Sequence, residues 1–191
     1  VELVATTAPG LDDLLVLGRI KAFERELRAD VIIVDGPAAG HALDLMRAPL
    51  QLKRAIGSGP ISSQADEVLA MLSDAHRCKV MMVTTPAMTP VSETAEAADD
   101  IVESVHVNLT PIVVNKCEAL VPAVDVTHLS AEMREAYQYA RDKLSAQEDA
   151  LAVLTDSLEL PQLHLSRHRL NGAELIEAIS GELSTAIAGL S

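Results

Sequence analysis

The hydrophobic and polar positions along the chain change their period several times, and each change predicts a new element. Short apolar runs without polar alternation occur at 31–34, 80–83 and 111–114, which is typical of buried parallel strands. Between them, apolar residues recur every three or four positions, as on the buried face of a helix. We therefore expect helices at 11–28, from 40 to about 49, at 63–72, 90–104, 130–154 and 171–188, and a last short strand at 158–160.

The predicted elements alternate between strand and helix from residue 31 onward. Such alternation is typical of an α/β fold, with a mostly parallel sheet, right-handed crossovers and helices on both faces. The segment 51–63, which contains Gly57, Gly59 and Pro60, is predicted to be a loop. The sequence contains no internal repeat, so we expect residues 1–191 to form a single domain.

Composition narrows the possible functions. A net charge of −13 and a pI near 4.7 argue against a general grip on nucleic acid. Cys78 and Cys117 fit no zinc-binding spacing, and we expect reduced thiols in a cytoplasmic protein. No apolar run approaches the roughly 18–20 residues that span a bilayer, so stable membrane insertion is not expected.

A carboxylate follows the apolar run 31–34. Asp35 comes directly after it, and Gly36, Pro37 and Gly40 then predict a tight loop that leads into a helix. The carboxyl edge of a parallel sheet is where such proteins bind ligands. Asp35 there could hold Mg²⁺ beside the phosphates of a nucleotide. The alternative is an ordinary turn in which Asp35 caps the next helix.

A second polar strand end is Asn115-Lys116-Cys117-Glu118, after the run 111–114. An Asn amide could pair with the edge of a purine base, and the Lys stem could lie along the ring. The alternative is a turn with Asn in a left-handed conformation.

Two features with histidine also allow two interpretations. His41 could sense a phosphate, or it could make a structural hydrogen bond to the backbone. His164, Arg167, His168 and Arg169 form a small basic cluster, for which a solvated surface loop is the simpler interpretation.

Taken together, the strand ends resemble one family. The segment from Asp35 to His41, Asp-Gly-Pro-Ala-Ala-Gly-His, is similar to the Asp-Thr-Ala-Pro-Thr-Gly-His segment of the ArsA-like ATPases, which include the arsenite-pump and tail-anchored-protein-targeting ATPases. The segment 9–13 resembles the Pro-Gly-Ile-Asp-Glu helix opening of that family, and 113–115 resembles its adenine-contacting strand end. Leu160-Pro161 and the segment 171–175 are similar to its closing elements.

The resemblance implies a P-loop NTPase-like, three-layer fold that uses ATP/ADP and Mg²⁺ in a dimer with two facing nucleotide sites. It implies that Asp35 is the Walker B carboxylate near Mg²⁺. Gly40 and His41 would belong to the second switch, which senses the γ-phosphate. Asn115 would read adenine, Lys116 would flank the base, and residues around Pro161 would close over it.

The sequence departs from the family in several places. It contains no Gly-x-x-x-x-Gly-Lys-Ser/Thr motif and no first switch, so we expect the N-terminal P-loop portion to be absent and this chain alone to be inactive. The segment 36–39 lacks the family's two hydroxyls. The segment 51–63 is too short and polar to form a Met-rich groove for tail-anchored clients, and no Cys cluster suggests an arsenite site.

The leading prediction is therefore the C-terminal part of a Mg²⁺-dependent ATPase that couples a nucleotide-driven dimer rearrangement to an unknown cargo. Its partner would be a second copy or a paralogue. The alternative is a non-hydrolysing regulatory or interaction subunit on the same scaffold. A partition-type ATPase is less favoured, because the tail 179–191 carries no Lys or Arg.

Overall fold

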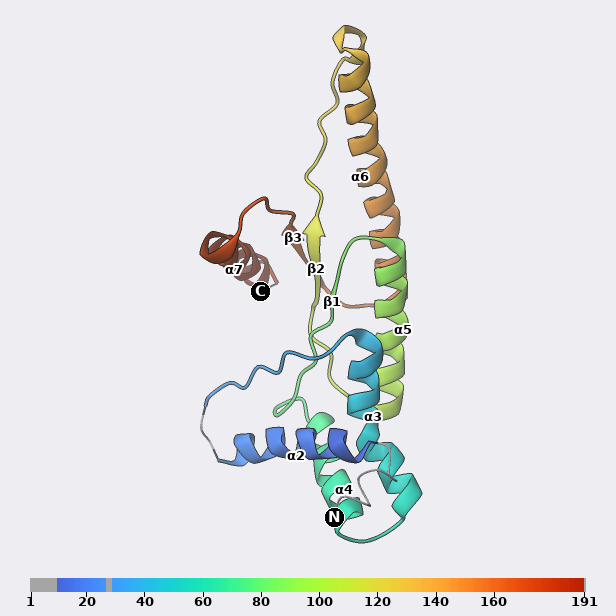
Figure 1. Ribbon diagram of the computed structural model, residues 1–191, viewed down its shortest axis with the longest axis vertical. Coiled ribbons are helices and arrows are strands. Elements are labelled where there is room, and N and C mark those ends of the chain that lie inside the picture. Colours follow the sequence, from blue (N-terminus) through green and yellow to red (C-terminus); the bar gives the residue numbers. More distant parts are fainter. Residues whose placement is uncertain (1–9, 27–28, 191) are drawn as a thin grey trace. The chain divides into compact units, whose positions relative to one another are not determined.

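The computed structural model describes residues 10–26 and 29–190 and has the predicted α/β architecture (Figure 1). The chain divides into two compact units. Unit 1 contains Val1–Val80 and Glu96–Leu109, and unit 2 contains Met81–Ala95 and Thr110–Ser191. Helix α5 (Met88–Val105) contributes to both. That the two units form a single domain stays a prediction.

Unit 2 is built on a parallel sheet with the order β1-β2-β3. Its strands are β1 (Val83–Thr84), β2 (Ile112–Cys117) and β3 (Gln162–Ser166). In the register, Val113 lies opposite Val83 on one side and opposite Leu163 on the other. The parallel pairing expected from the strand and helix alternation is confirmed.

Helices cover both faces of this sheet. Successive side chains of a strand point to opposite faces. Val113, Leu163 and Leu165 are buried and pack against α7 (Gly172–Ala188). Ile112 and Val114, on the other face, are fully buried. There the long helix α6 (Ala131–Ser157) lies across the strands from α7 (Figure 1). Ser130 caps this helix, because its hydroxyl accepts a hydrogen bond from the Met133 N–H at 3.3 Å.

Unit 1 is helical around one aliphatic core. It contains α2 (Leu11–Arg25), α3 (Ala39–Ile56), α4 (Pro60–Leu72) and the second part of α5. These helices share one buried apolar cluster, whose members include Leu14, Leu17, Leu52, Val68, Leu72, Ile101 and Val105. Beside it, Val80 and Leu109 form an isolated parallel bridge.

The predicted strand at 31–34 is wrong. Residues 31–38 form no strand or helix, and Val31 and Ile33 are 73% and 89% exposed. A central strand needs backbone partners and apolar neighbours on both faces, and within the described residues nothing pairs with this segment. An apolar run of this kind can pair with a neighbouring strand, but it becomes a strand only when such a partner is present.

The predicted helix end at Pro49 and the loop at 51–63 are also wrong. Helix α3 runs through Pro49, whose side chain is fully buried, and ends at Ile56. A proline inside a helix removes one backbone hydrogen bond, and burial of its ring offsets that loss. The actual break is short. Gly57 has a φ of 74° and Gly59 a φ of 121°, conformations that favour glycine, and Pro60 then begins α4.

The last strand lies later than predicted. Helix α6 continues to Ser157, and β3 begins at Gln162 instead of within 158–160. Leu163 and Leu165 alternate with the exposed His164 and Ser166, which is the pattern of a strand with one buried face. One member of the predicted basic loop, His164, therefore lies on a strand.

Candidate functional site

The carboxyl end of β2 forms a tight polar turn. Val114 is fully buried and Asn115 is half-buried, and Lys116 has a left-handed φ of 64°. The Asn115 Oδ1 accepts a hydrogen bond from the Lys116 N–H at 2.8 Å, which supports this costly backbone conformation. Within the described chain, no residue accepts a hydrogen bond from the Asn115 amide nitrogen. That amide remains available to a ligand.

The turn is anchored by Glu118 and three residues around it, which we name the Glu118 cluster: Glu118, Lys143, Gln147 and Arg167. Lys143 Nζ and Arg167 Nε each lie 2.8 Å from Glu118 Oε1. The Glu118 N–H donates to Oε1 of the buried Gln147 at 2.7 Å. The cluster therefore ties the end of β2 to α6 and to the segment after β3.

The ionisation of Glu118 reflects this environment. The hydrogen bond from Lys143 is the largest cause that lowers the pKa of Glu118 below its ordinary value, and the charge of Arg167 acts in the same direction. Partial burial opposes both effects. The carboxylate is thus held in its charged form, as a residue that binds two cations must be.

The segment after β3 lies beside the same strand end. Ser166 is opposite Cys117, and the Arg167 N–H donates to the Cys117 carbonyl at 2.8 Å. The Ser166 N–H donates to Glu182 of α7 at 2.7 Å, and His168 Nε2 lies 3.3 Å from the same carboxylate. Arg167 and His168 therefore border the Asn115 turn. The basic run Arg167-His168-Arg169 was the available sequence signal, but its position depends on the register of β3.

Pro161, the predicted closing residue, lies elsewhere on the sheet. Its carbonyl accepts a hydrogen bond from the Ile112 N–H at 2.9 Å, at the start of both strands. Asn115 and Lys116 are near the other end of β2. The structure thus brings Asn115 and Lys116 together and places Pro161 toward the opposite end, so its contact with a base stays a prediction.

The remaining predicted site residues belong to unit 1. Asp35 lies in the exposed segment before α3, and no described residue forms a hydrogen bond or ion pair with its carboxylate. Gly40 and His41 are exposed in the first turn of α3, which has no side-chain cap. The first backbone N–H groups of a helix have no partner within it. Asp35 therefore precedes an end of α3 that suits a negatively charged group.

A metal ion at this site would be held by a single carboxylate of the protein. The described residues contain no group of three or more His, Cys, Asp or Glu side chains arranged to hold an ion. Mg²⁺ at a nucleotide needs little protein, because it is commonly held by one or two carboxylates, by phosphate oxygens and by water. The exposed oxygen ligands of Asp35 fit that requirement and would not suit a closed zinc site.

Known proteins provide an independent comparison. ATPase BagA of Mycobacterium tuberculosis is 29% identical over 170 aligned residues, which cover 84% of this chain and 46% of that protein. The chain is thus similar to a protein that is named as an ATPase. A Halobacterium salinarum protein, named for arsenical pump-driving ATPases, is 25% identical over 116 residues, covering 56% of this chain and 18% of its own length. The chain spans about half the length of the first of these relatives, and no family model matches it.

These relatives agree with the predicted resemblance at the level of an ATPase family related to ArsA. A search for bilayer-spanning helices among the described residues finds none with the required length and hydrophobicity.

Proposed function

We propose that this chain is the part of an ATP-binding, Mg²⁺-dependent ATPase that reads the adenine base and senses the γ-phosphate. The observation that carries the proposal is the similarity to ATPase BagA over 84% of the chain. The parallel sheet with a polar turn at its carboxyl edge supports it, because open α/β sheets bind ligands at that edge.

At the phosphate end, Asp35 would hold Mg²⁺ and the first turn of α3 would receive the γ-phosphate. When bound, the ion would supply positive charge beside the phosphate oxygens. Gly40 and His41 contribute backbone N–H groups at the uncapped start of α3. Gly40 has no atom within 4 Å of the position that a Cβ would occupy, so a phosphate could approach its backbone.

The test of this role compares two carboxylates of the same exposed segment in the complete gene product. Asp35→Asn removes the charge without changing the size of the side chain, and we expect Mg²⁺-dependent ATP turnover to be lost. Asp30→Asn is the matched control, since Asp30 is also exposed, and should retain turnover. If Asp35→Asn retains as much turnover as Asp30→Asn, Asp35 does not belong to the site.

At the base end, the amide nitrogen of Asn115 donates to a ring nitrogen of adenine. Its Oδ1 continues to accept the hydrogen bond from the Lys116 N–H that supports the turn. Asn115→Asp preserves the oxygen that accepts from the Lys116 N–H but replaces the donor with an acceptor. We expect weaker ATP binding and a lost or reversed preference over GTP, because a carboxylate accepts the N–H groups of guanine.

Asn115→Ala separates base reading from turn formation, because it loses the donor and the oxygen together. It should lower both adenine preference and thermal stability, whereas Asn115→Asp should lower only the preference. Titration with ATP and GTP, next to melting curves, measures both effects. An unchanged ATP-to-GTP ratio in Asn115→Asp would exclude the base-reading role.

The same measurements separate the ATPase from the regulatory alternative. ATP binding with Mg²⁺-dependent turnover supports the enzyme, and nucleotide binding without turnover supports a non-hydrolysing subunit. We also propose that the complete protein acts as a dimer, with itself or a paralogue, and couples the nucleotide cycle to a cargo. A molecular mass that does not change with nucleotide and corresponds to a monomer would contradict this assembly.

A further inference from the structure

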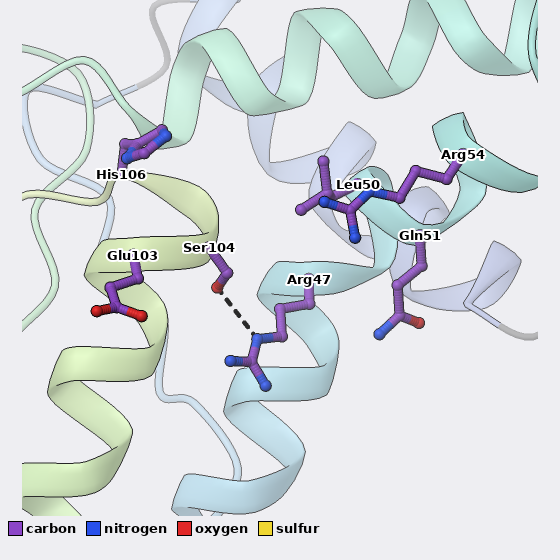
Figure 2. Close-up of a pocket in the computed structure, with 7 residues that line it drawn as sticks. All are labelled: Arg47, Leu50, Gln51, Arg54, Glu103, Ser104 and His106. Carbon is purple, nitrogen blue, oxygen red and sulfur yellow. Dashed lines mark hydrogen bonds between the residues drawn. The ribbon is translucent and has the colours of Figure 1, made fainter.

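A pocket of about 490 Å³ lies in unit 1 between α3 and the end of α5 (Figure 2). One face of α3 supplies Arg47, Gln51 and Arg54, and α5 with the residue after it supplies Ser104 and His106. Residues 47, 51 and 54 share a face because they are spaced by about one helical turn. The volume is within the range of small-molecule sites, about 300–1,000 Å³. None of the residues assigned to the nucleotide lines it.

The cations of α3 differ in how they are neutralised. Lys53 pairs with Asp66 at 2.5 Å, and Arg47 pairs with Asp100 at 2.9 Å. Arg54 has no acidic partner in the part of the chain that the structure describes. In Figure 2 its side chain runs back along α3, so that the guanidinium lies beside Leu50 at the pocket. In a chain with a net charge of −13, an unpaired guanidinium at a pocket favours an anionic ligand.

The other polar groups complete an anion site. Arg47 is held in place because its Nε donates to the Ser104 hydroxyl at 3.1 Å, as the dashed line in Figure 2 shows. His106 and Gln51 add further donors from the two sides of the pocket. Glu103 also lines it, but its carboxylate is directed away from Arg47 in Figure 2.

Besides the Glu103 carboxylate, the helix ends oppose an anion here. Arg54 and His106 lie at the C-terminal ends of α3 and α5, where a helix carries a partial negative charge of about half an electron. Each guanidinium carries a full positive charge and offers a planar fork of donors, which matches carboxylate and phosphate oxygens in pairs. The full charge of the unpaired Arg54 therefore outweighs the partial charge of the helix ends.

We propose that this pocket binds a small molecule through a terminal phosphate or carboxylate group, with Arg54 as its main contact. The guanidinium fork of Arg54 donates to either anion, Arg47 orients the ligand from the same helix, and His106 does so from the opposite wall. The site is separate from the proposed nucleotide function, and neither depends on the other.

The experiment titrates the full chain with inorganic phosphate and, separately, with succinate, at constant ionic strength, by calorimetry. We expect saturable binding of at least one anion, and the tighter one identifies the chemistry of the ligand. Arg54→Gln should weaken that binding by about tenfold or more, since a charge-assisted pair of hydrogen bonds is lost. Lys53→Gln removes the same charge from the neighbouring residue, outside the pocket, and should leave the affinity unchanged.

Three outcomes overturn the proposal. In the first, neither anion binds saturably. In the second, Arg54→Gln and Lys53→Gln weaken binding equally, which would indicate general charge attraction. In the third, phosphate binding survives Arg54→Gln, which would place the anion at another site such as the start of α3. Melting curves of both variants check that each remains folded.

Discussion

Replacing Glu118 with Gln tests whether one carboxylate holds the Asn115 turn. The change keeps the volume of the side chain and removes its charge, so the pairs with Lys143 and Arg167, both at 2.8 Å, are weakened together. Their cation side chains are 42% and 51% exposed, so each pair belongs in the range of partly solvated ion pairs, about 0.2–1 kcal/mol. We expect a loss of about 0.4–2 kcal/mol. At about 2–4 °C per kcal/mol, the melting temperature should fall by roughly 1–8 °C.

The pH dependence of this loss has a defined sign. Because the folded protein lowers the pKa of Glu118, the charged carboxylate stabilises the fold above its ordinary pKa near 4.5. That contribution disappears as the pH falls through the lowered value. The difference between the wild type and Glu118→Gln should therefore be full at pH 7 and vanish in acid. It should also shrink in 1 M NaCl, where the screening length is about 3 Å.

The assay is urea unfolding followed by circular dichroism at pH 7, at low pH and at high salt. Glu148→Gln is the matched control, since Glu148 lies exposed on the same helix α6 and should change stability by less than about 0.5 kcal/mol. If the two variants unfold at the same urea concentration at pH 7 in low salt, Glu118 does not anchor the turn.

Two further predictions concern unit 1. Ile33→Ser should change the stability of this chain by less than about 0.5 kcal/mol, because Ile33 is 89% exposed. Ile112→Ser, at a fully buried position of β2, should lower the free energy of unfolding by at least about 3 kcal/mol. If both variants unfold at similar urea concentrations, Ile33 is buried, as the predicted strand at 31–34 requires. Lys21 is 5% exposed and pairs with Glu67 at 2.5 Å. Lys21→Met keeps the apolar stem and should stay within about 1 kcal/mol of the wild type, whereas Lys21→Ala should cost about 2 kcal/mol or more. A Met variant as unstable as the Ala variant would show that the ion pair, and not the stem, supports the core.

The sequence predicted correctly those elements that their own residues specify. Helix α2 begins at Leu11 as expected, because its apolar stripe and the acidic residues Asp12 and Asp13 specify a helix locally. Strand β2 begins at Ile112, within one residue of the prediction. Its central position, buried on both faces, gives an apolar run that a single sequence already displays.

The errors occur where distant residues decide the structure. The run 31–34 is as apolar as the run 112–114 at the start of β2. A strand forms only where another strand supplies hydrogen bonds, and this requirement is not visible in the run itself. Pro49 is typical of a helix end, but its side chain is fully buried inside α3, and the local sequence does not show that burial. Arg167 reaches the Asn115 turn because Ser166 pairs with Cys117, and that register is a property of the sheet rather than of the basic run.

Asn115 shows why the two interpretations of its segment do not compete. The structural alternative was a left-handed turn, and such a turn is present, although Lys116 adopts the positive φ and Asn115 supplies the supporting hydrogen bond. By binding the Lys116 N–H through its oxygen, the side chain is held in one orientation, and its amide nitrogen stays unpaired at the edge of the sheet. A base-reading residue needs that fixed orientation, because a freely rotating amide would present donor and acceptor equally. The turn therefore orients the Asn115 amide. Only a variant that preserves the turn, such as Asn115→Asp, tests base reading separately from turn formation.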